Sequence, residues 1–108
     1  MASILIRQFD VFANPSGQTA QSFPFLVVLQ ADWVRETSSV IVAPLVRPNP
    51  ALRHPLLYPE FRIEARRLVL AISDLAALPR TRLTKRVANL DPERHRIIAA
   101  LDLLFTGS

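Results

Sequence analysis

The chain has 108 residues, half of them hydrophobic, which is enough for a single domain over residues 1–108 with one core. It contains no cysteine, which excludes disulfides, thiolate zinc sites and cysteine nucleophiles. Twelve arginines and one lysine outnumber nine acids, and the resulting net charge of +4 would suit a nucleic acid or an acidic protein surface as a partner.

The N-terminal residues lack the pattern of a signal peptide, and no apolar run approaches the roughly 20 residues of a membrane helix. We therefore expect a cytoplasmic protein with no membrane partner. A chain this small buries only a modest fraction of its surface, so an apolar face shared with a second copy would add stability. A homodimer is expected.

Short β-branched and aromatic runs separated by turn residues predict strands over the first two thirds of the chain. Ile4–Phe12 is the first run, and Asn14–Gly17 after it has the asparagine, proline and glycine of a turn. Phe25–Leu29 is apolar throughout and predicts a strand buried on both faces. In the first of these runs, Ile4–Phe12, one face of the expected strand would hold Leu5, Phe9 and Val11.

A third strand is expected at Val40–Val46, with Pro44 inside it. Proline has no backbone N–H to donate to the sheet, so Pro44 predicts a sheet edge or a bulge. Four prolines in the segment 47–59 exclude a regular helix there and indicate a long surface segment. Glu60–Ile63 and Arg67–Ile72 then predict a hairpin, although the turn between them lacks the usual glycine.

The segment Asp91–Phe105 predicts one amphipathic helix, since apolar residues recur at helical spacing with charges opposite them. The apolar face would hold Ile97, Ile98, Leu101, Leu104 and Phe105. Asp91 is suited to cap the N-terminus, Pro92 fits the first helical position, and Gly107 suits a left-handed stop. A β-rich chain with one C-terminal helix predicts an α+β fold, mainly β, built on a strongly bent antiparallel sheet.

Signals for catalysis are few, because the chain has no glycine-rich phosphate loop, no spacing of metal ligands and no paired-carboxylate motif. We therefore expect no cofactor, no metal site and no enzymatic activity. His54 and His95 are expected to be solvated or locally hydrogen-bonded, with a general-base role as the alternative. A ribonuclease needs only an acid, a base and an arginine, and Asp32 or Asp74 would be its carboxylate.

Signals for binding are stronger. Trp33 is the only tryptophan, follows an apolar strand, and is either a core residue or an exposed anchor. Arg80, Arg82, Lys85 and Arg86 form a basic cluster with no aromatic residue between them to stack on bases. This cluster predicts a solvated loop in preference to a nucleic-acid site.

Six short segments occur in the same order as the motifs of one known family, and one of them contains no change at all, the Leu-Tyr-Pro motif at Leu57–Pro59. The others are Asp10–Phe12, Leu29–Asp32, Val42–Leu45, Ser73–Pro79 and the pair Val87–Leu90 and Ala100–Gly107. Together they resemble the CcdB family, the toxins of ccd toxin–antitoxin systems that poison DNA gyrase.

The resemblance implies an SH3-like barrel, shared with the MazF and Kid toxins, that ends in a helix. It also implies a homodimer with the helix ends near the two-fold axis, which binds the DNA gyrase A subunit and traps gyrase on cleaved DNA. A CcdA-like antitoxin with a disordered segment would wrap the toxin, release gyrase and help repress the operon, a role tied to plasmid maintenance. DNA would then be a partner only through the antitoxin complex.

The resemblance assigns the gyrase contacts to the C-terminal end, with contributions from the helix and one loop. The residues are Ala31, Trp33, Val34, His95, Phe105, Thr106, Gly107 and Ser108. The family toxin ends in Phe-Trp-Gly-Ile, whereas this chain has Thr106 and Ser108 at the tryptophan and isoleucine positions. Losing those apolar anchors would weaken the interface, and Trp33, where the family has isoleucine, would return some aromatic area.

Two alternatives to the function of a gyrase poison remain open. The first is a non-toxic homologue that keeps antitoxin binding and operon regulation. The second is a MazF-like ribonuclease. In either case, the segment 80–86 would suit an acidic, disordered antitoxin segment better than it suits DNA.

Overall fold

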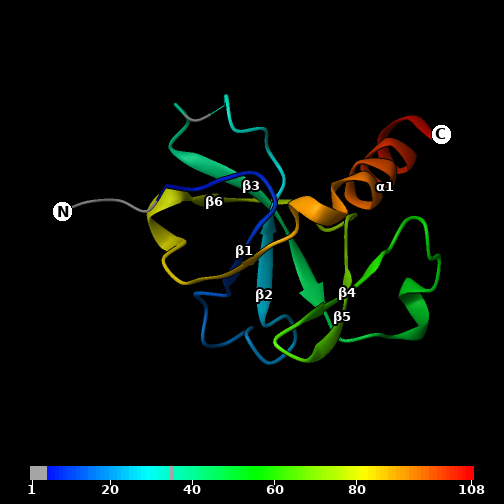
Figure 1. The fold of residues 1–108 in the computed structure, drawn as a ribbon. Helices are drawn as coiled ribbons and strands as arrows, with labels where there is room; N and C mark the ends of the chain where they lie inside the picture. The colour runs from blue at the N-terminus through cyan, green and yellow to red at the C-terminus, as the bar shows by residue number, and fades with distance from the viewer. Residues whose placement is uncertain (1–4, 35) are drawn as a thin grey trace.

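Seven strands and one α-helix make up the fold in the computed structural model, which describes residues 5–34 and 36–108 (Figure 1). The strands form one antiparallel sheet in the order β4-β5-β3-β2-β1-β7, and β6 pairs with β3 outside that path. The sheet curls into a half-barrel, which confirms the expected α+β, mainly β, SH3-like barrel. The elements are β1 (Asp10–Ala13), β2 (Phe25–Val28), β3 (Ser39–Val46), β4 (Glu60–Ile63), β5 (Arg66–Leu70), β6 (Ala76–Pro79), β7 (Arg86–Asn89) and α1 (Arg94–Thr106).

Strand β3 lies at the centre of the sheet. One side of β3 pairs with β2, while the other pairs first with β6, over Ser39–Val42, and then with β5, at Leu45 and Val46. Pro44 lies between these two stretches, and its carbonyl accepts a hydrogen bond from the Ala71 N–H at 2.9 Å. The N–H that proline lacks would point to the same side, where β3 changes partner. The expected edge or bulge at Pro44 is therefore wrong, because the missing donor falls at a change of partner in a central strand.

Strands β4 and β5 form the expected hairpin, with a turn of only two residues. Glu64 and Ala65 adopt φ values of 50° and 65°, the left-handed values that a type I′ turn requires at both central positions. Arg66 already belongs to β5, so the turn is shorter than the sequence predicts. Two residues with a Cβ therefore hold a backbone conformation that glycine adopts more readily.

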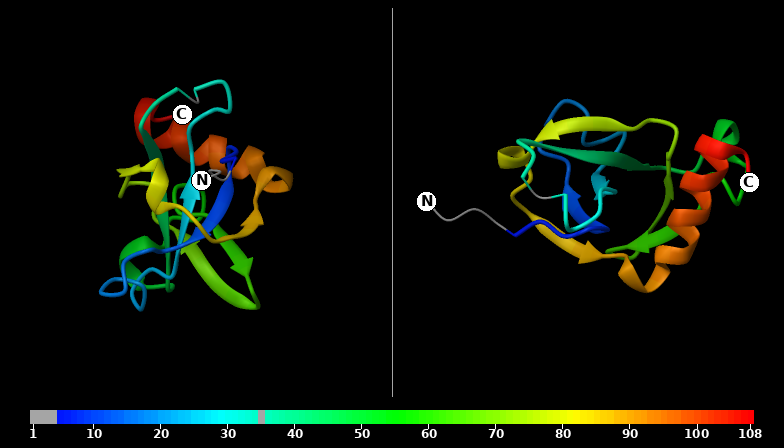
Figure 2. Two further views of the ribbon diagram at one scale, coloured as in Figure 1. Left: turned by 90° about the vertical axis from the view of Figure 1, so that its left-hand side faces the viewer. Right: turned by 90° about the horizontal axis from the view of Figure 1, so that it is seen from above.

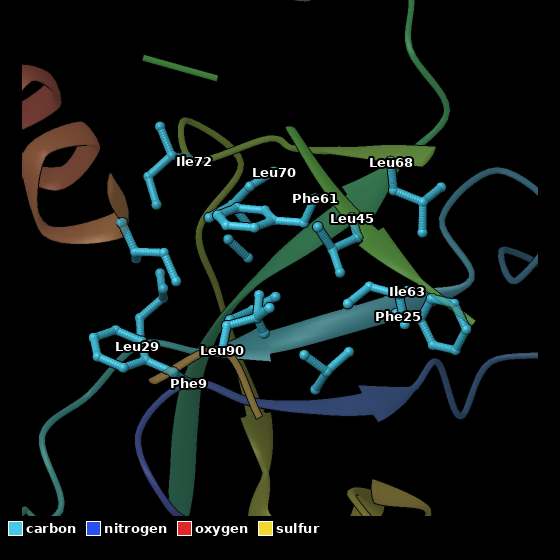
Figure 3. Packing of buried hydrophobic residues seen from close by; sticks show 14 of the residues in the cluster. Phe9, Phe25, Leu29, Leu45, Phe61, Ile63, Leu68, Leu70, Ile72 and Leu90 are labelled. Atoms are coloured by element: carbon cyan, nitrogen blue, oxygen red, sulfur yellow. The ribbon is translucent and has the colours of Figure 1, made fainter. Parts of the chain in front are cut away.

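The sheet separates two hydrophobic clusters, because alternate side chains of its strands point to opposite faces. The larger cluster lies between the sheet and α1, which contributes Ile97 and Ala100 (Figure 3). The smaller cluster lies on the other face, where Leu78 of β6 and Phe23 pack against it. All four residues of β2 are buried, two in each cluster, which confirms the prediction for that strand.

Strand β1 is shorter than the first apolar run predicts, since it begins only at Asp10. Ile4 lies outside the described residues. Leu5 is 59% exposed and does not join Phe9 and Val11 in the larger cluster. Phe9 has a φ of 69°, a left-handed value that cannot continue a strand, and this breaks the alternation between Leu5 and Val11.

The helix α1 begins at Arg94, because Asp91–Glu93 forms a 3₁₀ turn. The Asp91 carboxylate caps no backbone N–H and instead lies 3.2 Å from the Arg94 guanidinium. The Asn89 side-chain oxygen accepts a hydrogen bond from the Asp91 N–H at 2.7 Å. The predicted cap at Asp91 is therefore wrong, since Asn89 turns the chain toward the helix. Of the helices described, none is long and apolar enough to cross a membrane.

The proline-rich segment 47–59 runs over the surface between β3 and β4. Its regular structure is limited to a 3₁₀ turn at Pro50–Leu52, where the Asn49 side chain accepts a hydrogen bond from the Ala51 N–H at 2.9 Å. Most of its side chains are exposed. The expected surface segment without a regular helix is confirmed.

Candidate functional site

One side of α1 faces solvent along its whole length. Residues at spacings of three and four share a helix face. Here they are His95, Ile98, Asp102 and Phe105. The opposite side holds Ile97 and Ala100, which are fully buried against the sheet. Ile98 is 37% and Phe105 67% exposed, so apolar surface continues around the helix from its buried side into solvent.

The C-terminal end of α1 presents Phe105 just before a defined stop. Gly107 has a φ of 79°, and its N–H donates to the Leu103 carbonyl at 3.1 Å, which confirms the predicted left-handed stop. The Thr106 hydroxyl donates to the Asp102 carbonyl at 2.7 Å. The Thr106 side chain is therefore turned back along the helix, which leaves Phe105 as the exposed apolar group of this end.

The start of α1 is fixed to the sheet through Arg96. Its guanidinium pairs with Glu93 at 2.7 Å, donates to the Glu60 carbonyl at 2.7 Å and lies 4.5 Å from the centre of the Phe61 ring. A guanidinium over an aromatic face is attracted by the ring electrons. These contacts tie the helix to β4 and so set the direction in which its far end projects.

A second exposed apolar group lies in the loop between β2 and β3. Trp33 is 81% exposed, so it is not a core residue, and its role as an anchor stays a prediction. Ala31 and Val34 on either side are half-buried, and the Val34 N–H donates to the Ala31 carbonyl at 3.0 Å. This turn points Trp33 away from the sheet.

Two glutamines fix the shape of this loop. The Gln30 side chain donates to the Val34 carbonyl at 2.7 Å and accepts from the Ile41 N–H at 3.1 Å. The Gln8 backbone N–H donates to the Asp32 carboxylate at 2.6 Å, and the Gln8 side chain donates to the Leu29 carbonyl at 3.0 Å. Sequence reasoning missed both glutamines, because nothing in their local pattern distinguishes a loop brace from a solvated side chain.

The loop and the helix end do not form one patch within the chain. In Figure 1 both rise at the top of the molecule, the loop in cyan and the helix end in red. Seen from above in Figure 2, they lie well apart. His95 and Phe105 share a helix face but are separated by about 15 Å along the axis, given the rise per residue of an α-helix. The predicted site residues therefore divide into a helix patch (His95, Phe105, Thr106, Gly107, Ser108) and a loop patch (Ala31, Trp33, Val34).

Two of the four residues of the basic cluster are tied to the fold. Arg86 lies 2.9 Å from the carboxylate of the buried Asp10, and Arg80 donates to a backbone carbonyl at 3.1 Å. Arg82 and Lys85 are exposed, and neither has an acidic partner at ion-pair distance among the described residues. The cationic surface open to a partner is therefore smaller than the sequence indicates.

The groups that a ribonuclease would use are dispersed. His54 accepts a hydrogen bond from the Leu57 N–H at 3.3 Å within the proline-rich segment, and His95 is exposed on α1. Asp74 lines a groove that Arg82 also lines, but no histidine lines it. Over residues 5–34 and 36–108, no group of three or more histidine and acidic side chains could hold a metal ion.

Comparison with known proteins supports the motif resemblance. A family model described as CcdB protein matches residues 8–107, nearly the whole chain. The chain belongs to the CcdB family. Membership makes the protein, at the level of the family, a toxin of a toxin–antitoxin system. No curated protein matches the chain.

Proposed function

We propose that this CcdB-family protein acts as a cytoplasmic homodimeric toxin that binds the DNA gyrase A subunit and traps gyrase on cleaved DNA. It catalyses no reaction of its own, and a CcdA-like antitoxin neutralises it and represses the operon together with it. The observation that carries the proposal is the helix patch, where a rigid helix holds Phe105 67% exposed next to its stop at Gly107. Exposed aromatic side chains on rigid supports are the usual anchors of protein interfaces.

The loop patch supports the same function. Trp33 is 81% exposed on a loop braced by side-chain hydrogen bonds, so little conformational freedom is lost when a partner covers it. In Figure 1 the loop and the helix end both stand at the top of the molecule. In a dimer with the two helix ends near its axis, two Trp33 rings would flank two Phe105 rings. Trp33 then supplies aromatic area that the chain lacks at Thr106 and Ser108.

Measured binding to the gyrase A subunit tests this proposal. Phe105→Ala and Trp33→Ala should each weaken binding about 30-fold, since truncating an interface aromatic removes about 2 kcal/mol. Leu56→Ala is the matched control, because Leu56 is also 67% exposed but lies in the proline-rich segment. Unchanged binding by Phe105→Ala would refute the role of the helix patch, and unchanged binding by Trp33→Ala would refute the role of the loop patch.

Expression in a gyrase-sensitive host separates the alternatives. A gyrase poison arrests growth with DNA cleavage, and the arrest disappears in Phe105→Ala and persists in Leu56→Ala. A MazF-like ribonuclease would fragment RNA instead. A non-toxic homologue would leave growth unchanged yet still bind an antitoxin. Arrest with RNA fragmentation, or no arrest, would each contradict the proposed function.

A further inference from the structure

A hollow of about 510 Å³ lies between the proline-rich segment and strands β4 and β5. Figure 1 shows the segment, in green, beside these two strands. Val69 of β5 and Leu52 of the segment give the hollow apolar surface, and Tyr58 gives it an aromatic ring. Its volume lies in the range of ligand sites in proteins. It shares no residue with the helix patch or the loop patch.

The walls of the hollow are held in place by the chain itself. The Tyr58 N–H donates to the His54 carbonyl at 2.8 Å, and the Tyr58 hydroxyl lies 3.0 Å from the Ser73 hydroxyl. Three prolines also line the hollow, and each ring fixes the φ of its residue. They are Pro48, Pro50 and Pro55. Because its walls are already ordered, the hollow loses little conformational entropy when a ligand enters.

Arginines from two elements stand at this hollow. Arg53 lines it from the proline-rich segment, and Arg96 lines it from α1. Arg53 is exposed and has no acidic partner at ion-pair distance in the part of the chain that the structure describes. Among the described residues, Glu60 is the one acid that lines the hollow, and it lies 3.5 Å from Arg67 Nε. The hollow therefore favours a ligand with negative charge.

Two arginines extend the positive charge along the hairpin of β4 and β5. Glu60 is paired with Val69, and two positions further along β4 Arg62 is paired with Arg67. Side chains two apart on a strand, or paired across two strands, point to the same face. Like charges directly opposite each other destabilise a hairpin, and over residues 5–34 and 36–108 Arg62 has no acid at ion-pair distance. Stability does not account for this pair of arginines, whereas a bound anion does.

We propose that the hollow and its arginines bind single-stranded nucleic acid. We call this surface the arginine face, made of the hollow together with Arg53, Arg62, Arg67 and Arg96. One unpaired base enters the hollow against the Tyr58 ring, and the neighbouring phosphates lie against the arginines. Proteins that bind single strands combine these two features, a cationic surface for the backbone and an aromatic ring for the bases.

The chemistry of the arginine face distinguishes this ligand from two other polyanions. In a duplex the bases are paired and stacked, so none is free to enter the hollow. An acidic peptide has charge but no flat base to fill a space lined by Tyr58 and prolines. The contact would be direct, whereas the family resemblance implies contact with DNA only through the antitoxin complex. The inference does not depend on gyrase binding.

Fluorescence anisotropy with labelled oligonucleotides tests the proposal. Strands of about 12 nucleotides, oligo(dT) and oligo(U), should both bind, and the tighter one identifies DNA or RNA as the source of the strand. Their affinity should fall roughly 20-fold between about 50 and 200 mM salt, as expected for about three neutralised phosphates. An abasic strand of the same length should bind about tenfold more weakly, because it has no base to stack.

Variants locate the binding. Arg53→Gln and Arg62→Gln should each weaken binding about fivefold and reduce the slope of log affinity against log salt by about 0.7. Both side chains are exposed, and Arg62→Gln should melt no lower than the wild type, since it removes the repulsion from Arg67. Arg82→Gln is the matched control, because Arg82 is an exposed arginine of the basic cluster and lies outside the arginine face. It should change affinity by no more than about twofold.

Several results would overturn the inference. One is the absence of binding to either strand, and another is equally tight binding of a duplex or of the abasic strand. Displacement of the strand by polyglutamate at equal charge would show a general site for acidic chains. Binding lost in Arg82→Gln but kept in Arg53→Gln and Arg62→Gln would place the strand on the basic cluster. Phe105→Ala separates this inference from the proposed function, because it should weaken gyrase binding and leave oligonucleotide binding unchanged.

Discussion

Asp10 connects three parts of the chain through one buried carboxylate. It is 2% exposed, the one fully buried charged side chain in the described part of the molecule. One oxygen accepts from the Arg7 N–H at 2.8 Å and lies 2.9 Å from Arg86 Nε, and the other accepts from the Asn89 side chain at 3.0 Å. These bonds join β1 to both ends of β7, the strand that leads into α1.

Asp10→Ala should lower the free energy of unfolding by about 3 kcal/mol, because breaking a buried pair leaves its cation and several donors without an acceptor. This loss of stability is at the lower end of the range for breaking a buried ion pair, since the Arg86 side chain is 38% exposed and can reach water. Urea denaturation measures the change. Glu60→Ala is the control, because its pair with Arg67 is exposed and should contribute less than about 1 kcal/mol. Equal effects of the two variants would contradict the role of Asp10.

The turn at Ala65 predicts a substitution that stabilises the protein. Ala65→Gly removes a left-handed strain of about 1 to 2 kcal/mol, while the greater freedom of glycine in the unfolded chain offsets about 0.5 to 1 kcal/mol. The free energy of unfolding should therefore rise by about 0.5 to 1 kcal/mol in thermal or urea denaturation. Ala77→Gly, in the extended and exposed strand β6, should lower it instead. A decrease in both variants would show that the turn holds Ala65 without strain.

At the scale of a structural element, Gly107 sets where α1 ends. Its φ is 79°, and no atom lies within 4 Å of the position that a Cβ would take, so Gly107→Ala would be penalised by backbone conformation alone. A penalty of about 1 kcal/mol should speed hydrogen exchange of the amide at position 107 about fivefold. Gly107→Asn should have a smaller effect, because asparagine tolerates the left-handed conformation. Identical exchange in all three proteins would mean that the stop does not hold the last turn.

Elements set by local pattern were predictable from the sequence, and those set by remote partners were not. The apolar run of β2 and the helical spacing around Ile97 identify their elements directly. The same spacing places Phe105 on the apolar face of the helix and so does not predict that its side chain is 67% exposed. The central position of Pro44 depends on β5 and β6, which the chain reaches only later. The loop that carries Trp33 is held in part by the bond from the Gln8 backbone N–H to the Asp32 carboxylate, 24 positions apart in the chain, and no local pattern reveals this bond.

Across the whole molecule, the two patches lie apart. The loop and the helix end both stand at the top in Figure 1, but from above in Figure 2 they are well separated. The loop patch borders the face of the sheet opposite α1, since Ala31 and Val34 line a small hollow together with Val28 of the smaller cluster. A partner that contacts both patches must therefore either span this distance on one chain or meet the two patches on different copies of a dimer.

At the scale of the whole molecule, we predict a homodimer whose interface is built on α1. Ile98 is 37% exposed and Leu101 half-buried along the flank of α1, and covering this flank with a second copy places the two Phe105 side chains near a common axis. Sedimentation equilibrium should show a dimer. Ile98→Glu should raise the dimer dissociation constant about 30-fold or more, because burying an unpaired carboxylate is unfavourable, and should leave the monomer fold intact. Leu56→Glu carries the same change on an exposed residue of the proline-rich segment and should remain dimeric. A wild-type monomer, or equal dissociation in both variants, would refute a dimer built on α1.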